Sequence, residues 1–462
     1  MFGLLRGQNV SGAMLFQLGV ELSWLFAAIM VVLRVDPQET VPRTEVALVA
    51  FVFAATIICL NIAFGLYRRA QALSMSSYLL RVVLAPAVGI PLALLAAQFL
   101  PGGVPLQEQW SSALLLALVG LLLVRHVIVL PLVAALLPHR VLVLGTGPEA
   151  RLVEASLTSA NPVGIRLVGF YALERTNDAS SVSPGKVVAH GASLEDTVRQ
   201  LGVDEVIVAV RQQRGGVLPL RSLLDCRLDG VQITDLARYF ERVHGQVPIE
   251  SLKVSWLIYG HGFRQSALRN VVKRSFDLLV SAVLIVLTAP ILLLASLLIA
   301  AEGGGPIIFR QERVGFRGRT FTVLKLRSMS RDAEQDGKAT WAVRNDARVT
   351  RVGRLIRRFR IDELPQLLNV LKGEMSFVGP RPERPEFVAM LTEQIPFYAV
   401  RHSVKPGLTG WAQVRYSYGA TVEQSIRKLE YDLYYVKNHT LLLDLVILLE
   451  TVRVVLLGEG AR

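Results

Sequence analysis

The distribution of apolar residues predicts membrane helices in the first third of the chain. Four apolar runs, near residues 13–33, 46–66, 78–100 and 112–137, are each long enough to cross about 30 Å of hydrocarbon, which takes about 20 residues. Basic residues are more frequent between the second and third runs and after the fourth than in the other two loops. The positive-inside rule therefore predicts a four-helix transmembrane domain, residues 1–138, with both ends in the cytoplasm.

Three ionisable side chains fall inside these spans: Glu21, Arg125 and His126. Ionisable groups are costly inside a membrane and often functional, so they mark a candidate site. The alternative is contact between helices, or a side chain that reaches the membrane surface. We favour this structural interpretation.

A fifth apolar run, residues 275–300, differs from the first four because bases lie on both sides of it. Pro290 stands in its middle, where a proline removes a backbone hydrogen bond and kinks a helix. Basic flanks favour both ends staying in the cytoplasm. We therefore expect a helix that is broken at Pro290, enters the inner leaflet and returns. A straight fifth span, which would place the following segment outside, is the alternative.

Between residues 139 and 268, strand-like and helix-like patterns alternate, which predicts a Rossmann-like α/β domain with a parallel sheet. The expected strands are residues 140–144, 167–170, 186–189 and 205–210, and the expected helices are residues 149–159, 194–201 and 217–228. The first strand runs into Gly145-Thr-Gly147, close to a dinucleotide-binding fingerprint. No clear acid for a ribose follows, so a tight turn in a regulatory or dimerising, CoA-binding-like module remains an alternative.

Composition supports a membrane protein and locates its charge. The chain of 462 residues is 52% hydrophobic and 19% charged, which fits neither a typical soluble enzyme nor a disordered chain. Its formal net charge is +13, and residues 306–361 hold fifteen Lys/Arg against five Asp/Glu. Such concentrated charge indicates an anionic partner such as lipid or phosphate. The two cysteines, Cys59 and Cys226, cannot build a disulfide framework.

Within this basic segment, residues 346–360 alternate arginines with apolar residues at helical spacing. The pattern predicts a basic amphipathic helix on the anionic inner leaflet. Nucleic acid is the rival partner. It is disfavoured because the apolar stripe is continuous and the chain is already embedded in a bilayer.

Two adjacent carboxylates, Asp362 and Glu363, follow the basic helix. Nearby positive charge should keep them ionised. An ionised carboxylate can attack phosphorus, and a second can hold Mg²⁺ against phosphate oxygens. Downstream, Arg381 stands between Pro380 and Pro382 and suits bidentate phosphate recognition. Both motifs also have a structural alternative. The acidic pair could simply begin a helix, and the Pro-Arg-Pro motif could form a turn.

A series of ordered motifs runs from Lys273 to about residue 457: Lys273-Arg-Ser-Phe-Asp277, Gly305-Pro306, Gln311-Glu-Arg-Val-Gly315, Lys325-Leu-Arg-Ser-Met329, Asp362-Glu-Leu-Pro-Gln-Leu-Leu-Asn369, Ser376-Phe-Val-Gly-Pro-Arg-Pro382, Lys405-Pro-Gly-Leu-Thr-Gly-Trp-Ala-Gln413 and Tyr431-Asp-Leu-Tyr-Tyr-Val-Lys-Asn438. With these motifs the segment resembles the bacterial sugar transferase family, the polyprenol-phosphate sugar-phosphate transferases. The part of the chain ahead of it, including Phe64-Gly-Leu-Tyr-Arg68, resembles the long form of that family. The resemblance implies an α/β-type monotopic catalytic domain, residues 269–462, with a re-entrant membrane helix at about residues 275–300.

The resemblance also implies a reaction and its site. A UDP-sugar would give its sugar-1-phosphate to undecaprenyl phosphate and leave UMP, at the cytoplasmic face of a bacterial inner membrane, as the first step of exopolysaccharide or capsule assembly. Asp362 would be the covalent nucleophile and Glu363 the Mg²⁺ ligand. The residues implied to bind substrate are Arg381, Lys325, Arg327, Arg313 and Arg415. The middle domain would be regulatory or form a homodimer, and the identity of the sugar is left open.

Two other functions remain possible at this point. A membrane-anchored nucleotide-sugar dehydratase or epimerase would use the middle domain and NAD, although the chain has no Tyr-x-x-x-Lys pair. A non-catalytic scaffold or flippase of polysaccharide export would use the spans, but it gives no reason for the order of Asp362, Glu363 and Arg381.

Overall fold

A computed structural model of the chain forms two compact units, Met1–His244 and Gly245–Arg462, and each is described by itself. The structure describes residues 12–34, 43–63, 66–67, 82, 85–86, 88–95, 109–129, 131–132, 135, 138–160, 165–173, 180–188, 193–210, 217–249, 252, 257, 267–303, 305–330, 346, 348–416 and 421–457.

The first unit begins with three apolar helices, α2 (Gly12–Arg34), α3 (Arg43–Ala63) and α5 (Gln109–Leu123), the last of which runs into a π-helix, η1 (Val124–Val129). Helix α2 packs against both α3 and α5. Their apolar segments, Phe16–Val31, Val46–Ile62 and Leu115–Val129, are short. Most of the predicted third span and the basic loop before it lie outside the described residues, so the number of four spans stays a prediction.

The ionisable residues of these helices form contacts between helices, as the structural interpretation predicts. Glu21 is fully buried and accepts hydrogen bonds from Arg125 at 2.8 and 2.9 Å. The Tyr67 hydroxyl and the Gln17 amide donate to the same carboxylate, at 2.6 and 2.8 Å. His126 instead lies at the exposed surface, 2.9 Å from a backbone carbonyl of its own helix. The buried charge of Glu21 is therefore fully compensated.

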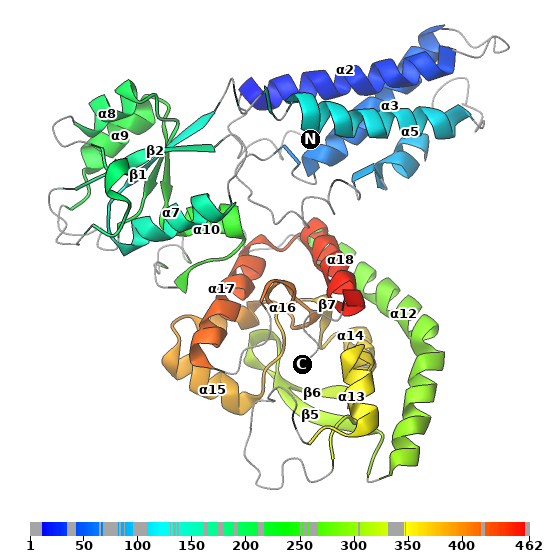
Figure 1. The fold of residues 1–462 in the computed structure, drawn as a ribbon. Coiled ribbons are helices and arrows are strands. Elements are labelled where there is room, and N and C mark those ends of the chain that lie inside the picture. Colours follow the sequence, from blue (N-terminus) through cyan, green and yellow to red (C-terminus); the bar gives the residue numbers. More distant parts are fainter. Residues whose placement is uncertain are drawn as a thin grey trace. The chain divides into compact units, whose positions relative to one another are not determined.

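The predicted parallel sheet follows these helices (Figure 1). Its strands are β1 (His139–Leu144), β2 (Ile165–Tyr171), β3 (Glu205–Val208) and β4 (Gln232–Asp235), in the order β2-β1-β3-β4 and all parallel. Helices α7 (Pro148–Ala160) and α10 (Leu236–His244) pack on one face. Helices α8 (Leu194–Gln200) and α9 (Leu220–Leu228) pack on the other. Apolar side chains alternate between the two faces, which gives the domain two cores.

Two details of this domain differ from the sequence expectation. The expected strand at residues 186–189 is wrong for its described part: Lys186 ends a 3-10 turn, and Val187 makes one isolated bridge with Phe170. The fourth strand is β4 instead, a half-buried segment whose pattern is too short to stand out. In the turn after β1, Gly145 has φ +115, and a Cβ there would lie 2.6 Å from the Ala209 carbonyl oxygen. Packing therefore requires this glycine whether or not a nucleotide binds.

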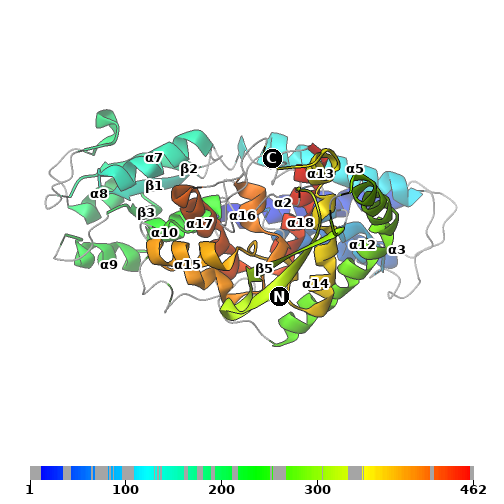
Figure 2. The same ribbon diagram turned by 90° about the horizontal axis from the view of Figure 1, so that it is seen from below.

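The second unit combines a long apolar helix with two small sheets (Figure 2). Helix α12 (Ala267–Glu302) leads into an antiparallel hairpin, β5 (Ile308–Val314) and β6 (Thr320–Leu326). Strands β7 (Ser376–Val378) and β8 (Gly407–Thr409) form a parallel pair. The other helices are α13 (Arg351–Arg358), α14 (Leu367–Lys372), α15 (Pro385–Gln394), α16 (Trp411–Arg415), α17 (Val422–Asn438) and α18 (Leu441–Leu457).

Helix α12 is, within the described part of the chain, the one helix long and apolar enough to cross a membrane. It continues through Pro290, so the predicted break in the helix is not observed. Figure 1 shows the helix bending along its length instead. A proline removes a single ladder hydrogen bond, and a bend relieves the clash of its ring without ending the helix.

Both ends of α12 are attached to the same domain. Near its start, Arg274 donates to the carbonyls of Val370 and Leu371 at the end of α14, at 2.6 and 2.8 Å. At its end, the Glu302 carboxylate accepts from the first backbone N–H groups of α13, at 3.1 and 3.3 Å. The middle of the helix exposes large apolar side chains, such as Leu287 (66%) and Leu293 (64%).

Candidate active site

The acidic pair lies in a short 3-10 helix, η5 (Ile361–Gln366), directly after α13. Thr350 caps the start of α13 by accepting a hydrogen bond from the Gly353 N–H at 2.9 Å. Arg360, with φ +57, takes the left-handed conformation between α13 and η5. This local geometry buries Asp362 and Glu363 to the same extent, at 7% exposure each.

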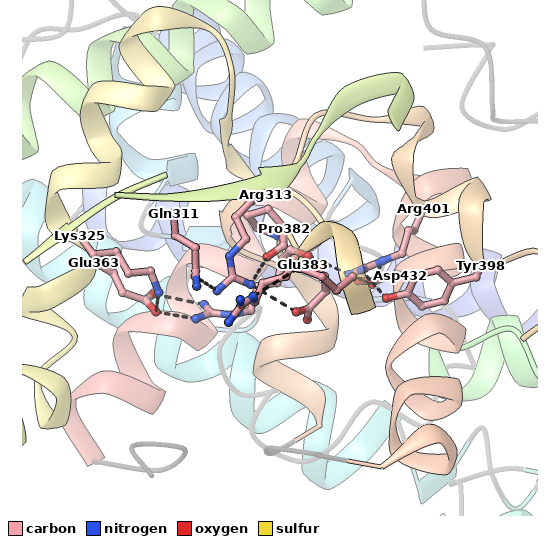
Figure 3. A network of polar contacts seen from close by, with 12 residues as sticks. Gln311, Arg313, Lys325, Glu363, Pro382, Glu383, Tyr398, Arg401 and Asp432 are labelled. Carbon is pink, nitrogen blue, oxygen red and sulfur yellow. Dashed lines mark hydrogen bonds and ion pairs between the residues drawn. The ribbon is translucent and has the colours of Figure 1, made fainter. Parts of the chain in front are cut away.

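Three cations surround the Glu363 carboxylate (Figure 3). Arg381 donates through Nη2 to Oε1 at 2.7 Å and through Nη1 to Oε2 at 3.4 Å. Lys325 Nζ, from β6, lies 3.4 Å from Oε1, and Arg360 Nη1 lies 3.6 Å from it. The structure therefore places two predicted substrate-binding residues, Lys325 and Arg381, in contact with Glu363, the predicted Mg²⁺ ligand.

Asp362 is compensated less completely, although Lys325, Arg357 and Arg360 lie near enough to lower its pKa. Its Oδ1 is buried and has no hydrogen-bond partner among the residues that the structure describes. Burial, together with the neighbouring charge of Glu363, raises the pKa of Asp362 to about 6. A carboxylate with an unsatisfied oxygen and a pKa near 6 is ionised at neutral pH yet poorly solvated, which suits a nucleophile.

The pKa values of Glu363 and Lys325 are lowered, whereas that of Asp362 is raised. Burial opposes the charge of Glu363, but Arg381, Lys325 and Arg360 outweigh it and hold its pKa well below the usual value. Burial lowers the pKa of Lys325, and Glu363 partly offsets this effect. Glu363 thus serves as the fixed anion that holds cations beside Asp362.

The donor set can be compared with the expected Mg²⁺ ion. No group of three or more His, Cys, Asp or Glu side chains among the described residues could hold a metal. Both oxygens of Glu363 already accept from Arg381. The unpartnered Oδ1 of Asp362 is the available ligand. A single carboxylate fits Mg²⁺ where substrate phosphates complete the coordination, so the fit is to Asp362 rather than to Glu363.

Arg313, from β5, lies beside the Pro-Arg-Pro loop. Its Nη2 donates to Gln311 Oε1 at 2.5 Å, and its Nη1 lies 3.3 Å from the Pro382 carbonyl and 3.5 Å from Glu383 Oε2. Figure 3 shows these residues in a row with Lys325 and Glu363. Arg313 is therefore part of the same charged network as the acidic pair.

The other two predicted substrate-binding residues have structural contacts. Arg327 Nη2 donates to the carbonyls of Ile299, at 3.0 Å, and Gly303, which are orphan acceptors at the end of α12. Arg415 lies over the Trp411 ring, 4.3 Å from its centroid, with Glu450 3.9 Å away.

Sequence reasoning missed four residues of the network: Arg360, Glu383, Arg401 and Asp432. Arg360 stands two residues before Asp362, so its position in the sequence is a usable signal. Asp432 lies within the Tyr431-Asp motif, but nothing in the sequence connects it to the site. With Lys428, the network holds an excess of positive charge, which suits a ligand with several negative charges.

Comparison with known proteins shows which family this chain is similar to. The family described as bacterial sugar transferase matches residues 268–458. The chain is 47% identical over 192 residues to the UDP-glucose:undecaprenyl-phosphate glucose-1-phosphate transferase of Caulobacter vibrioides, covering 41% of this chain and 71% of that protein.

Two further relatives extend the comparison. The undecaprenyl-phosphate glucose phosphotransferase of Komagataeibacter xylinus is 36% identical over 332 residues, 70% of this chain and 60% of that protein. The UDP-N-acetylgalactosamine-undecaprenyl-phosphate N-acetylgalactosaminephosphotransferase of Aeromonas hydrophila is 43% identical over 242 residues, 52% of this chain and 56% of that protein. The chain thus spans less than two thirds of these two relatives.

Proposed function

Because the chain belongs to the bacterial sugar transferase family, we propose that it transfers a sugar-1-phosphate from a UDP-sugar to undecaprenyl phosphate and releases UMP. The observation that carries this proposal is the buried Asp362, whose unpartnered oxygen lies beside a Glu363–Arg381–Lys325 network. The named activities of the relatives support the general reaction. They differ in the sugar, so the sugar is not assigned.

The chemistry would proceed in two displacements at one phosphorus. In the first, an Asp362 oxygen attacks the sugar-bearing phosphorus of the donor, and the bond to the UMP oxygen breaks. In the second, a phosphate oxygen of undecaprenyl phosphate attacks the same phosphorus and restores the Asp362 carboxylate. Neither step needs a proton, because every entering and leaving group is an anion. Arg381 and Lys325 would neutralise the charge that builds up on the phosphoryl oxygens.

Mg²⁺ would supply further neutralisation of the donor phosphates when bound. Its ligand from this chain would be one oxygen of the Asp362 carboxylate, which leaves the other oxygen for the attack on phosphorus. Glu363 would act indirectly, by holding Arg381 and Lys325 in place.

The proposed location is the inner leaflet of the cytoplasmic membrane. Both ends of α12 contact the same domain, and its exposed apolar middle needs lipid. A continuous, bent helix whose middle dips into one leaflet while both ends stay at its surface satisfies both facts. On α13, Leu355 (53% exposed) and the following Phe359 (50%) stand among arginines, as expected for a helix on an anionic surface. The four spans, the role in exopolysaccharide or capsule assembly and a homodimer through the middle domain belong to the same proposal.

The decisive assay measures UMP release from a UDP-sugar panel with undecaprenyl phosphate and Mg²⁺. We expect Asp362→Asn to lose at least about 1,000-fold in turnover, because an amide cannot form the phosphoaspartyl bond. Asp229→Asn is the matched control, since Asp229 forms an exposed ion pair with Arg199 in the α/β domain. Near-normal turnover by Asp362→Asn would refute the covalent mechanism.

The dehydratase alternative is not favoured. Packing against Ala209 explains Gly145, the residue that suggested a dinucleotide site. The relatives are named as sugar-phosphate transferases. Purified protein that carries bound NAD would revive this alternative.

A further inference from the structure

We propose that Arg401, held by Asp432, is a positioning residue that fixes the Pro380-Arg381-Pro382 loop, and with it the Arg381 guanidinium, against the acidic pair. The inference rests on the proposed function. It assigns a catalytic purpose to two buried charged residues that make no contact with Asp362 or Glu363 among the described hydrogen bonds and ion pairs.

The loop that carries Arg381 is held at four consecutive carbonyls. Backbone N–H groups of Gly407 and Val314 donate to the Pro380 and Glu383 carbonyls, both at 2.9 Å. The two carbonyls between them accept from guanidinium groups instead.

Those two guanidinium groups come from distant parts of the chain. Arg401 Nη2 donates to the Arg381 carbonyl at 2.9 Å, and Arg313 Nη1 donates to the Pro382 carbonyl at 3.3 Å. Prolines offer no N–H, so this loop cannot form a regular backbone ladder of its own. Its conformation therefore depends on these side-chain donors.

The buried side chain of Arg401 is held by an ion pair with Asp432 and a hydrogen bond to Tyr398. Its side chain is 6% exposed and that of Asp432 is 2% exposed. Nε and Nη2 both donate to Asp432 Oδ2, at 3.0 and 2.8 Å, and Nη1 donates to the Tyr398 hydroxyl at 3.0 Å. Nη2 also donates to the Arg381 carbonyl. Figure 3 shows this group at the end of the row that begins with Lys325 and Glu363.

Burying an arginine–aspartate pair is seldom justified by stability, because desolvation offsets most of the attraction. Correct placement of the Arg381 guanidinium would explain why the Arg401–Asp432 pair is buried here. A displacement of about 1 Å at a group that binds the reacting phosphate can cost about 100-fold in rate. Arg401 would act through Arg381 and would not touch the substrate itself.

A double-mutant cycle on the full-length protein in lipid nanodiscs tests the inference. Arg401→Lys keeps the charge beside Asp432 but cannot reach both acceptors. We expect it to lower kcat/KM for UMP release about 10- to 100-fold, whereas Arg427→Lys, at an exposed arginine of α17, stays within about twofold. In an Arg381→Ala background, Arg401→Lys should lower the remaining rate less than about threefold, because the group it positions is gone.

The outcomes separate the two proposals. An equal fold-loss from Arg401→Lys with and without Arg381 would overturn the positioning role, because a general structural defect is additive. Unchanged activity in Arg401→Lys would overturn it too. If Arg401→Lys does not fold, Tyr398→Phe repeats the cycle by removing one acceptor of Arg401, with an expected loss of about threefold that also vanishes without Arg381. Wild-type protein that releases no UMP from any donor would refute the proposed function instead.

Discussion

The carboxyl groups of Asp362 and Glu363 are adjacent and equally buried, yet their pKa values move in opposite directions. Three cations compensate Glu363, whereas one oxygen of Asp362 has no hydrogen-bond partner within the described part of the chain. The two carboxylates therefore differ in charge compensation, and the proposed mechanism uses this difference.

The pH dependence of the reaction should follow Asp362. Burial and the charge of Glu363 raise its pKa to about 6, so the reactive anion is lost as the pH falls through that value. We expect kcat/KM to be flat near pH 7.5 and to fall about tenfold per pH unit below 6. Rates of UMP release measured between pH 4.5 and 8 would check this. A profile that stays flat down to pH 4.5 would contradict it.

Glu363→Gln should shift the fall in kcat/KM at acidic pH to a lower pH. The substitution removes the negative charge that raises the pKa of Asp362. It also weakens the hold on Arg381 and Lys325, so turnover at pH 7.5 should fall about 100-fold. Glu386→Gln, at an exposed residue of α15, is the control and should keep the wild-type profile. An unshifted fall in kcat/KM would show that Glu363 does not act on Asp362 electrostatically.

Asp362→Asn should stabilise the protein at neutral pH while it abolishes turnover. A carboxyl group whose pKa is raised in the folded state favours folding while protonated, and this contribution is lost as the pH rises through about 6. The amide resembles the protonated acid. We therefore expect a free energy of unfolding higher by on the order of 1–3 kcal/mol at pH 7.5 and a negligible difference near pH 4. Thermal melting at both values would check this, and equal destabilisation at both would contradict it.

Arg327→Met should affect stability more than donor binding. Arg327 donates to two carbonyls at the end of α12, and removing it takes this donor from the carbonyl of the buried Ile299. Such a loss costs about 1–3 kcal/mol. Hydrogen exchange should increase in residues 295–303, while KM for the UDP-sugar stays within about twofold. A large rise in KM with normal exchange would instead support the substrate-binding role that the family resemblance implies.

The two ends of α12 should be accessible from the same side of the membrane. In a variant without Cys59 and Cys226, cysteines at Leu268 and Arg319 would flank the helix at exposed positions. A membrane-impermeant maleimide should label both in inside-out vesicles and neither in right-side-out vesicles. Labelling of Arg319→Cys from the periplasmic side would establish a crossing helix and refute re-entry.

Local patterns predicted the local elements well. Periodicity located β1, α7 and the core of the basic helix, since each depends on residues that are close in the chain. The basic helix was predicted over residues 346–360 and covers Arg351–Arg358, because Val349 instead forms a bridge with Met329. The same patterns failed at β4, which is mostly polar and only partly buried, unlike the fully buried β3 of the same length, and at Pro290, where a bend replaced the expected break.

The acidic pair could be identified as a candidate from the sequence, but its division of roles could not. Adjacent residues share the same local charge, and burial, which the sequence does not report, sets how strongly each neighbour acts. Which of the two carboxylates holds Mg²⁺ stays a proposal, because the fold brings Lys325 and Arg381 onto Glu363 from 38 and 18 residues away.

The sequence by itself determined the features on which the proposed chemistry depends: an apolar chain, a basic segment, a pair of carboxylates and a proline-bounded arginine in a fixed order. Only the tertiary structure decided which carboxylate is better compensated, that Arg327 donates to carbonyls at the end of α12, and that Arg401, paired with Asp432, donates to the Arg381 carbonyl. The reason is physical. Composition and periodicity depend on neighbours along the chain, whereas charge compensation depends on distances between residues that folding alone brings together.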